Sequence, residues 1–380
     1  MKYRAWNRAD IGAKSVQNGC GSRRIRHETA VLPYSQKVRM KQSHSGTTCG
    51  SGELALLNAI RRRAARGSRG GIRLGIGDDC ALLAVRKGEE LAVTTDLSLA
   101  GRHFRLDWHS PESVGHRALA RGMSDLAAMG ARPVAAFLSL GLPCELTVAD
   151  GRKQGWMQRF MDGFFALAER YDSPLAGGDL AESTVAVADI VLVGAVPRGQ
   201  ALLRSGARVG DLLYVTGTLG GAAAGLARLA ELASSSRRNP PRIPKKLVAL
   251  LAPHLYPQPR IAQGLWLQRR GLATAALDLS DGLSTDLTHI CEESGVAAEV
   301  DERLIPMASG ATPAQALHGG EDYELLFTAP TAVRMPSSIA GVQVTNIGRI
   351  VKARADRSTI TLITERGRQS LGAQGWEHFR

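Results

Sequence analysis

The sequence of 380 residues lacks the features of several large protein classes. It has only 5 cysteines, widely spaced and without a C-x-x-C pair, so it predicts neither a disulfide framework nor a zinc site. Its 5 Trp, 6 Tyr and 7 Phe are too few for the aromatic surfaces that bind single-stranded nucleic acid. No run of eighteen apolar residues occurs that would form a membrane-spanning helix. These absences indicate a reduced, cytoplasmic protein with no membrane and no nucleic acid as partner.

The net charge of +13 is distributed unevenly along the chain. Residues 1–50 contain ten Lys or Arg against two acids, which leaves only +5 for the other 330 residues. This segment has no apolar stretch long enough for a secretory signal, and we expect a disordered extension without a functional role. Its Arg and Ser content is also typical of organelle transit peptides, and Met40 is an alternative start. The remainder has the mild basicity of an enzyme that handles phosphates.

Helical and strand patterns mix along the remaining chain without a regular βαβ repeat. This predicts an α+β fold, with a first domain at 51–200 and a second at 201–380. Helices are expected at 53–66, 111–129, 148–171, 220–233, 260–270 and 283–294. Strands are expected at 91–95, 134–142, 185–196, 212–216, 274–279, 323–328, 343–350 and 359–364. The Ser- and Pro-rich segment 234–244 reads as a loop within the second domain.

Carboxylates recur beside Gly or Ser at predicted strand ends. The segments are Gly75–Asp79, Thr94-Thr95-Asp96, Ser124-Asp125, Gly177-Gly178-Asp179, Asp278–Gly282 and Gly319–Tyr323. Any one of them is ordinary turn or helix-capping chemistry. Gathered together they would repel one another unless cations neutralised them. Oxygen ligands of this kind favour Mg²⁺ acting together with substrate phosphates.

The familiar nucleotide-binding motifs are missing. There is no G-x-x-x-x-G-K-[ST] sequence and no protein-kinase set of V-A-I-K, H-R-D and D-F-G. The segment 217–221, Gly-Thr-Leu-Gly-Gly, follows a predicted strand and opens a helix. Its backbone N–H groups could bind a phosphate, but the glycines are explained equally well by close packing at the start of the helix.

Taken in order, the motifs resemble the thiamine-monophosphate kinase family, which shares a superfamily with aminoimidazole ribonucleotide synthetase and selenophosphate synthetase. The resemblance covers about residues 52–379. The segments that carry it are 75–81 (GIGDDCA), 94–96 (TTD), 101–104 (GRHF), 124–130 (SDLAAMG), 177–179 (GGD), 203–206 (LRSG), 214–218 (YVTGT), 277–282 (LDLSDG) and 319–325 (GGEDYEL).

The resemblance implies an ATP-dependent phosphotransferase that converts thiamine monophosphate to thiamine diphosphate, with Mg²⁺ as cofactor. It implies a two-domain α+β fold, with an N-terminal domain that pairs in a homodimer and a layered C-terminal domain. The active site would lie in the cleft between the two domains. No general base is expected, since an acceptor phosphate with a second pKa of about 6 is already largely dianionic at neutral pH.

Each site residue is carried over by its motif. By resemblance the metal ligands would be Asp79, Thr94, Thr95, Asp96, Asp125, Asp278 and Asp281, with Asp78 as an uncertain neighbour. ATP would be contacted by Tyr171, Gly178, Asp179, Arg204 and Ser280. Thiamine monophosphate would be contacted by His103, Glu321 and Trp376. For Arg204 a solvated surface position, and for His103 and Trp376 ordinary packing, remain the alternative interpretations.

One segment departs from the family pattern. The family usually reads Val-Asn-Leu before the Ser-Asp pair, whereas this chain reads Arg121-Gly122-Met123. A glycine inside a helix costs about 1 kcal/mol relative to alanine. The departure removes the Asn contact and puts the metal geometry at Asp125 in question.

Three alternative interpretations have weaker support in the sequence. Cys20 lies in a sequence similar to the reactive-cysteine loop of selenophosphate synthetase, but it is far upstream and no Lys follows it. A hydrogenase-maturation dehydratase would end in cysteine, whereas this chain ends in His-Phe-Arg. A basic nucleic-acid-binding protein would show steep salt dependence that disappears with residues 1–50.

Overall fold

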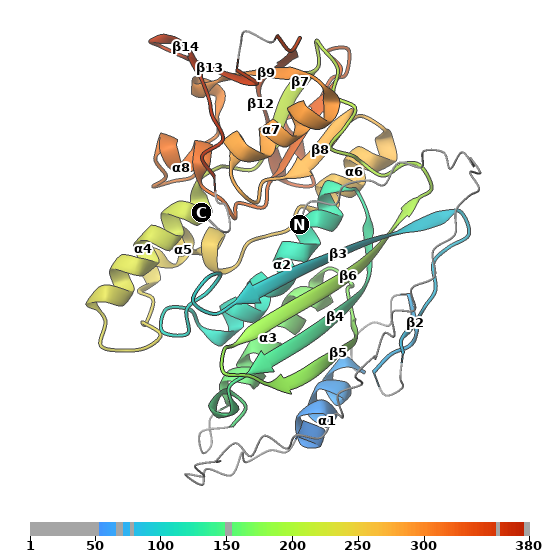
Figure 1. Cartoon of the computed structure of the whole chain (residues 1–380), viewed down its shortest axis with the longest axis vertical. Coiled ribbons are helices and arrows are strands. Elements are labelled where there is room, and N and C mark those ends of the chain that lie inside the picture. Colours follow the sequence, from blue (N-terminus) through green and yellow to red (C-terminus); the bar gives the residue numbers. More distant parts are fainter. Residues whose placement is uncertain (1–52, 66–70, 77–79, 149–153, 355–357, 376–380) are drawn as a thin grey trace, which may run out of the picture. The chain divides into compact units, whose positions relative to one another are not determined.

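Two large β-sheets, a small two-stranded sheet and the helices packed on them make up the part of the chain that the computed structural model describes (Figure 1). The described residues are 53–65, 71–76, 80–148, 154–354 and 358–375. These residues belong to one compact unit. The expected extension of residues 1–50 lies outside them, so that prediction stays untested. Within the described residues, no helix combines the length and the apolar character needed to cross a membrane.

The first half of the chain forms a four-stranded sheet covered by helices on one face (Figure 1). Its strands, in spatial order, are β3 (Glu89–Leu99), β6 (Val187–Pro197), β4 (Arg132–Leu142) and β5 (Leu175–Glu182). Only the β4–β5 pair is parallel. Along β3, Thr94 and Asp96 are partly buried, whereas Leu91, Val93 and Leu97 are exposed, as expected for alternate residues on opposite faces.

Helix α2 (Pro111–Ala128) is an interior helix, with fifteen of its eighteen residues buried. The Ser110 side chain accepts a hydrogen bond from the Ser113 N–H, and Pro111 occupies the first turn, so the helix begins where the sequence predicts. A Cβ at Gly115 would lie 1.9 Å from the Phe160 carbonyl oxygen of α3 (Trp156–Arg170). A Cβ at Gly264 of α6 (Ile261–Arg270) would lie 1.9 Å from the Ala127 carbonyl oxygen. Because glycine has no side chain at these two positions, α3 and α6 can both pack closely against α2.

The second half forms an eight-stranded mixed sheet with helices around it (Figure 1). In spatial order its strands are β14 (Gly367–Ser370), β13 (Ile360–Thr364), β9 (Ala297–Asp301), β12 (Val342–Val351), β7 (Leu212–Thr216), β10 (Leu325–Ala329) and β8 (Ala275–Asp278), with β11 (Ser338–Ile339) beside β12. Its helices are α4 (Gly221–Ser235), α5 (Val248–Leu255), α6, α7 (Leu283–Ser294) and α8 (Pro313–His318). The remaining elements are α1 (Glu53–Ala64), β1 (Ile72–Leu74), β2 (Leu82–Leu83) and the short 3-10 turns η1 (Cys144–Leu146), η2 (Lys245–Leu247) and η3 (Glu302–Leu304).

Most predicted elements are confirmed, and β7 and α7 match to the residue. The predicted helix 148–171 is wrong at its start, because α3 begins at Trp156, after Gly155 in an extended conformation. Strand β5 was missed, since its Leu-Ala-Gly-Gly-Asp sequence is typical of a turn. Helix α5, which contains Pro253, and strand β9 were also missed.

The expectation for the cysteines is wrong at one position. Cys80 and Cys291 carry free thiols, as predicted. Cys144, in η1, is disulfide-bonded. Spacing along the sequence gave no indication of this bond, because cross-linked cysteines need only be close in space.

Candidate active site

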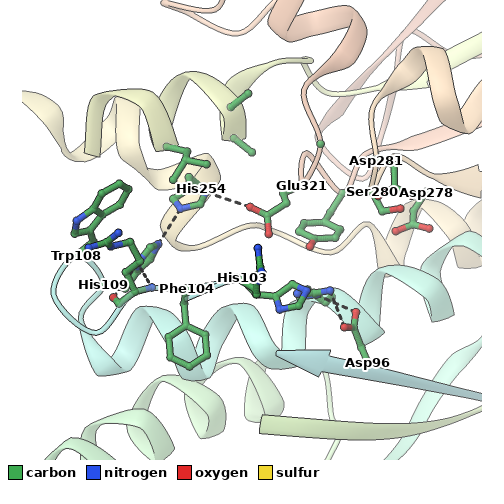
Figure 2. Close-up of a pocket in the computed structure, with 18 of the residues that line it drawn as sticks. Asp96, His103, Phe104, Trp108, His109, His254, Asp278, Ser280, Asp281 and Glu321 are labelled. Atoms are coloured by element: carbon green, nitrogen blue, oxygen red, sulfur yellow. Dashed lines mark hydrogen bonds and ion pairs between the residues drawn. The ribbon is translucent and has the colours of Figure 1, made fainter. Parts of the chain in front are cut away.

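A cavity of about 520 Å³ lies where the two halves of the chain meet (Figure 2). From the first half it is lined by β3, α2 and the loop 101–109 that joins them. From the second half it is lined by α4, α5, the loop after β8 and the loop before β10. Seven residues predicted as ligands line it together: Asp96, His103, Asp125, Asp278, Ser280, Asp281 and Glu321. Sites separated by more than two hundred residues in sequence therefore share one cavity.

At the floor of this cavity, Asp278 and Asp125 bring two buried carboxyl groups under mutual influence. Burial raises the pKa of Asp278 to about 7, and the charge of Asp125 adds to this shift. Burial also raises the pKa of Asp125, while a hydrogen bond of 2.5 Å from the Thr94 hydroxyl opposes the increase. The positive charge of Arg204 lowers the pKa of both carboxyls without overcoming burial. Carboxyl groups with raised pKa values bind a proton readily, and a nearby metal cation would stabilise their ionised form.

Asp96 is paired differently, with an arginine of α2. The Arg121 Nε donates to one carboxylate oxygen of Asp96 at 3.0 Å, and Nη2 lies 2.8 Å from the other (Figure 2). Burial raises the pKa of Asp96 and Arg121 opposes the increase. Both oxygens of Asp96 are thus engaged by one guanidinium group in the bidentate geometry typical of arginine.

Hydrogen bonds join the loop after β8 to the loop before β10 and fix the positions of Asp281 and Glu321. The Asp286 carboxylate accepts hydrogen bonds from the N–H groups of Asp281 and Gly282, both at 3.0 Å. The Glu321 N–H donates to the Ser280 carbonyl oxygen at 2.8 Å. Glu321 and Tyr323 both have positive φ angles, of 70° and 51°, which non-glycine residues rarely adopt. Strand β10 therefore begins at Leu325, two residues later than predicted.

Glu321 lies at the far end of the cavity among cationic and imidazole groups. Its carboxylate accepts a hydrogen bond of 2.5 Å from Arg117 and lies 3.4 Å from the His254 Nδ1. Burial alone would raise the pKa of Glu321, but Arg117 and His254 together hold it well below its usual range. His254 in turn contacts His109, with 3.0 Å between their Nε2 atoms (Figure 2). Burial, Arg117 and His254 lower the pKa of His109 to about 3, so this imidazole is neutral.

Six predicted ligands among the described residues are not lining residues of this cavity. Gly178 and Asp179 line a second cavity of about 460 Å³ beside Gly75, Ile76 and Cys80. The Tyr171 hydroxyl donates to the Pro259 carbonyl oxygen at 3.0 Å. Thr95 is exposed on the sheet face opposite to Thr94, and Arg204 is also exposed. Thr94 itself reaches the cavity only through Asp125, whereas Asp78, Asp79 and Trp376 lie outside the described residues.

Several residues in or next to the cavity were missed as site residues by the sequence analysis. They are Arg117, which pairs with Glu321 without lining the cavity, and the lining residues Arg121, His109 and His254. The first two had a usable signal, since Arg117, Arg121 and Asp125 are spaced by four residues and share one face of α2. The histidines had none, because they come from separate loops and helices that meet only in the folded chain.

The donor chemistry of the cavity suits Mg²⁺ at one end only. Within the described ranges, no three His, Cys, Asp or Glu side chains are arranged to hold a metal ion by themselves. Asp125 and Asp278 are oxygen donors in an anionic, buried setting, which fits an ion that completes its shell with water and phosphate. Asp96 does not fit in the same way, because Arg121 holds both of its oxygens.

Two family models and several curated relatives match most of the chain. The family model for the AIR synthase related protein, N-terminal domain, matches residues 77–197, and the model for the C-terminal domain matches residues 208–360. The chain is 40% identical to the thiamine-monophosphate kinase of Escherichia coli (strain K12) over 340 residues, which are 86% of this chain and 98% of that protein. The two family models support a two-domain α+β fold with mixed sheets.

Two solved structures are similar to the whole described fold. The thiamine-monophosphate kinase of Stenotrophomonas maltophilia K279a has a TM-score of 0.69 and 38% identity, covering 82% of this chain and 96% of that one. A structure described as "AaThiL complexed with AMPPCP and TMP" has a TM-score of 0.65 and 28% identity, covering 89% of this chain and all of that one.

Proposed function

The chain belongs to the thiamine-monophosphate kinase family, and from this membership we infer that it transfers the γ-phosphoryl group of ATP to thiamine monophosphate, giving thiamine diphosphate and ADP. The observation that carries this inference is the cavity in which carboxylates from both halves of the chain converge. The selenophosphate synthetase and nucleic-acid alternatives lose their support, because the identity to thiamine-monophosphate kinases extends over most of the chain.

The chemistry of the cavity suits transfer between two phosphates. The acceptor phosphate is its own nucleophile, so no side chain has to remove a proton. The obstacle is the repulsion between two polyanions, which bound cations reduce while an in-line geometry is maintained. Arg102 lines the same cavity and supplies positive charge there. We therefore assign catalysis to positioning and electrostatics rather than to a nucleophile and base.

We propose that Mg²⁺ is held around Asp125, Asp278 and Asp281, with Thr94 and Asp79 as further ligands. Thr95 is left out, because its side chain lies on the opposite, exposed face of β3. When bound, the ion would neutralise phosphate charge. The raised pKa values of Asp125 and Asp278 support this assignment, because each carboxyl lacks a fully compensating cation. Asp96 is omitted from the set because its oxygens are held by Arg121.

We propose that the acceptor end of the cavity is the Glu321 end, where His103 and Glu321 would contact thiamine monophosphate together with Trp376. A carboxylate that stays ionised is suited to the cationic thiazolium ring. ATP would contact Ser280 and Arg204 near the acids, Gly178 and Asp179 at the second cavity, and Tyr171, which lines neither cavity. The supporting observation is that Ser280 lies beside Asp278 and Asp281 in the wall of the first cavity.

The larger assembly is also part of the proposal. The domains would span 51–200 and 201–380, with the active site in the cleft between them. The exposed apolar face of β3, formed by Leu91, Val93 and Leu97, would pair with a second copy in a homodimer. We place the enzyme in the cytoplasm, where ATP is available.

The test is an assay of the purified chain with ATP, Mg²⁺ and thiamine monophosphate, following thiamine diphosphate. The variant Asp281→Asn and a reaction without metal should both lose product formation. Asp172→Asn is the matched control, because Asp172 is exposed after α3 and asparagine tolerates the same positive φ of 50°. Absence of product from folded wild-type protein that binds ATP would show that the acceptor is a different molecule.

A further inference from the structure

We propose that Arg121 is a built-in cation of the active site, which takes the place of a divalent ion at Asp96 and confines metal binding to the end of the cavity formed by Asp125 and Asp278. The proposal rests on the proposed function in taking this cavity as the Mg²⁺ and phosphate site. It assigns Arg121 a positioning role that neither its sequence motif nor the resemblance to relatives supplies.

The first support is the geometry of the pair. Nε and Nη2 of Arg121 each face a different oxygen of Asp96, at 3.0 and 2.8 Å. A metal ion at Asp96 would have to displace at least one of these charge-assisted hydrogen bonds. It would also approach a guanidinium group that keeps its positive charge at every accessible pH. Both effects disfavour a divalent ion at this carboxylate.

The second support is the environment of the guanidinium group. The Arg121 side chain is 16% exposed and the Asp96 side chain 20% exposed, so solvent screens the pair only weakly. The Nη1 atom of Arg121 is buried without a hydrogen-bond partner among the described residues. The positive charge of Arg121 is therefore incompletely compensated by hydrogen bonds, and it also acts on Glu321 and Tyr323. A merely structural arginine would be expected to have its buried donors satisfied.

The third support is the contrast with the neighbouring acids. Within the described residues, Asp125 accepts a hydrogen bond from Thr94, and neither Asp125 nor Asp278 has an arginine in bidentate contact, so both can accept an external cation. Asp96 has its cation already attached to α2. The position of that cation is fixed by the helix, because Gly122 packs its backbone closely, with Leu192 2.9 Å from where a Cβ would lie. The small Gly122 thus allows α2 to approach the sheet closely enough for Arg121 to reach Asp96 of β3.

The proposal is tested by counting bound Mn²⁺ as a substitute for Mg²⁺. Free Mn²⁺ is measured by electron paramagnetic resonance in titrations of the full chain, with and without a non-hydrolysable ATP analogue. The Arg121→Gln variant should bind one more ion per chain than wild type, or bind its weakest ion about tenfold more tightly, since a carboxylate has been released. Arg121→Lys keeps the positive charge but not the bidentate contact, so its effect on Mn²⁺ binding should be smaller than that of Arg121→Gln. Arg303→Gln, at an exposed ion pair, is the control.

A second variant keeps the test decisive if Arg121→Gln does not fold. Asp96→Asn should leave the number of bound Mn²⁺ ions unchanged, because Asp96 holds none, whereas Asp125→Asn should weaken binding at least about tenfold. Loss of an ion in Asp96→Asn, or unchanged binding in folded Arg121→Gln, overturns the proposal. So does wild-type protein that binds no Mn²⁺.

The two proposals fail separately. If wild type forms no thiamine diphosphate but the Mn²⁺ counts are as expected, the proposed reaction is wrong and the role of Arg121 stands. If product forms but Asp96→Asn loses an ion, the reaction stands and the role of Arg121 is wrong.

Discussion

At one end of the cavity Glu321 is held by Arg117 and lies beside His254, whereas at the other end Asp278 and Asp125 are buried without a bidentate cation. The pKa of Glu321 is lowered and that of Asp278 is raised, although burial would raise the pKa of both carboxyls: Asp278 is buried and the Glu321 side chain is 27% exposed. Burial is common to the two ends, so the difference comes from the charged neighbours. At the Glu321 end, which we call the compensated end, the chain itself supplies the cation that balances the carboxylate. At the other end, the uncompensated end, the charge of Asp125 and Asp278 would be balanced by a bound cation.

The largest effect should follow from breaking the compensated end. Arg117→Ala leaves Glu321 buried without its cation and removes the hydrogen bond to the His103 carbonyl oxygen. We expect a loss of about 3–5 kcal/mol in the free energy of unfolding, because an uncompensated charge remains. Urea unfolding at pH 7 measures this. Arg228→Ala, at an exposed pair on α4, is the control, and equal losses in the two variants would contradict the comparison.

The uncompensated end should respond in the opposite direction. Asp278→Asn is expected to raise the stability of the metal-free protein at pH 8 by roughly 2–4 kcal/mol, at about 1.4 kcal/mol per pKa unit. The pKa of Asp278 in the folded state, about 7, lies above the ordinary value of 3.8 for this side chain. The folded state therefore binds more protons between these values, and wild-type stability falls as pH rises. The advantage of the variant should vanish near pH 4. Thermal unfolding in chelator across this range is the measurement, and an advantage independent of pH would show that charge is not its cause.

A smaller effect should follow from the hydroxyl that supports Asp125. Thr94→Val removes the donor to a carboxylate, and we expect a loss of about 1–2 kcal/mol at pH 7. Thr95→Val, on the exposed face of the same strand, should change stability by less than about 0.5 kcal/mol. Chemical denaturation of both variants tests the difference between the two faces of β3, and similar values would refute it.

The smallest effect is expected at a charged pair outside the cavity. Arg159 and Glu112 form two hydrogen bonds between α3 and α2, but their side chains are 39% and 32% exposed. Solvent screening should limit the cost of Arg159→Ala to about 0.5 kcal/mol. A loss in urea unfolding as large as that of Arg117→Ala would mean that burial does not control these ion pairs.

The sequence predicted elements with clear apolar periodicity and failed where local chemistry was ambiguous. Strand β7 and helix α7 were predicted to the residue, since each has a distinct period and a turn or glycine at its ends. Strand β5 was missed because its glycines are typical of turns, and only pairing with β4 makes it a strand. The disulfide at Cys144 was missed because it depends on spatial proximity.

The candidate site was predictable in its acids and not in their partners. Asp125, Asp278 and Glu321 stand in recognisable motifs, and the structure brings them to one cavity. Their different charge states depend on Arg117, Arg121 and His254, which reach them across the fold. Sequence motifs therefore located the carboxylates, whereas the electrostatic role of each carboxylate required the tertiary structure.

The tight crossings of α2 have a consequence for how the site tolerates change. Gly115 and Gly264 hold this helix against α3 and α6 at points where no side chain fits. Arg117, Arg121 and Asp125 are attached to the same rigid helix, so they share one alignment with β3 and with the loops of the second half. A methyl group added at either glycine would shift all three charges together. Variants at these remote positions should therefore behave as active-site defects although every cavity residue is unchanged.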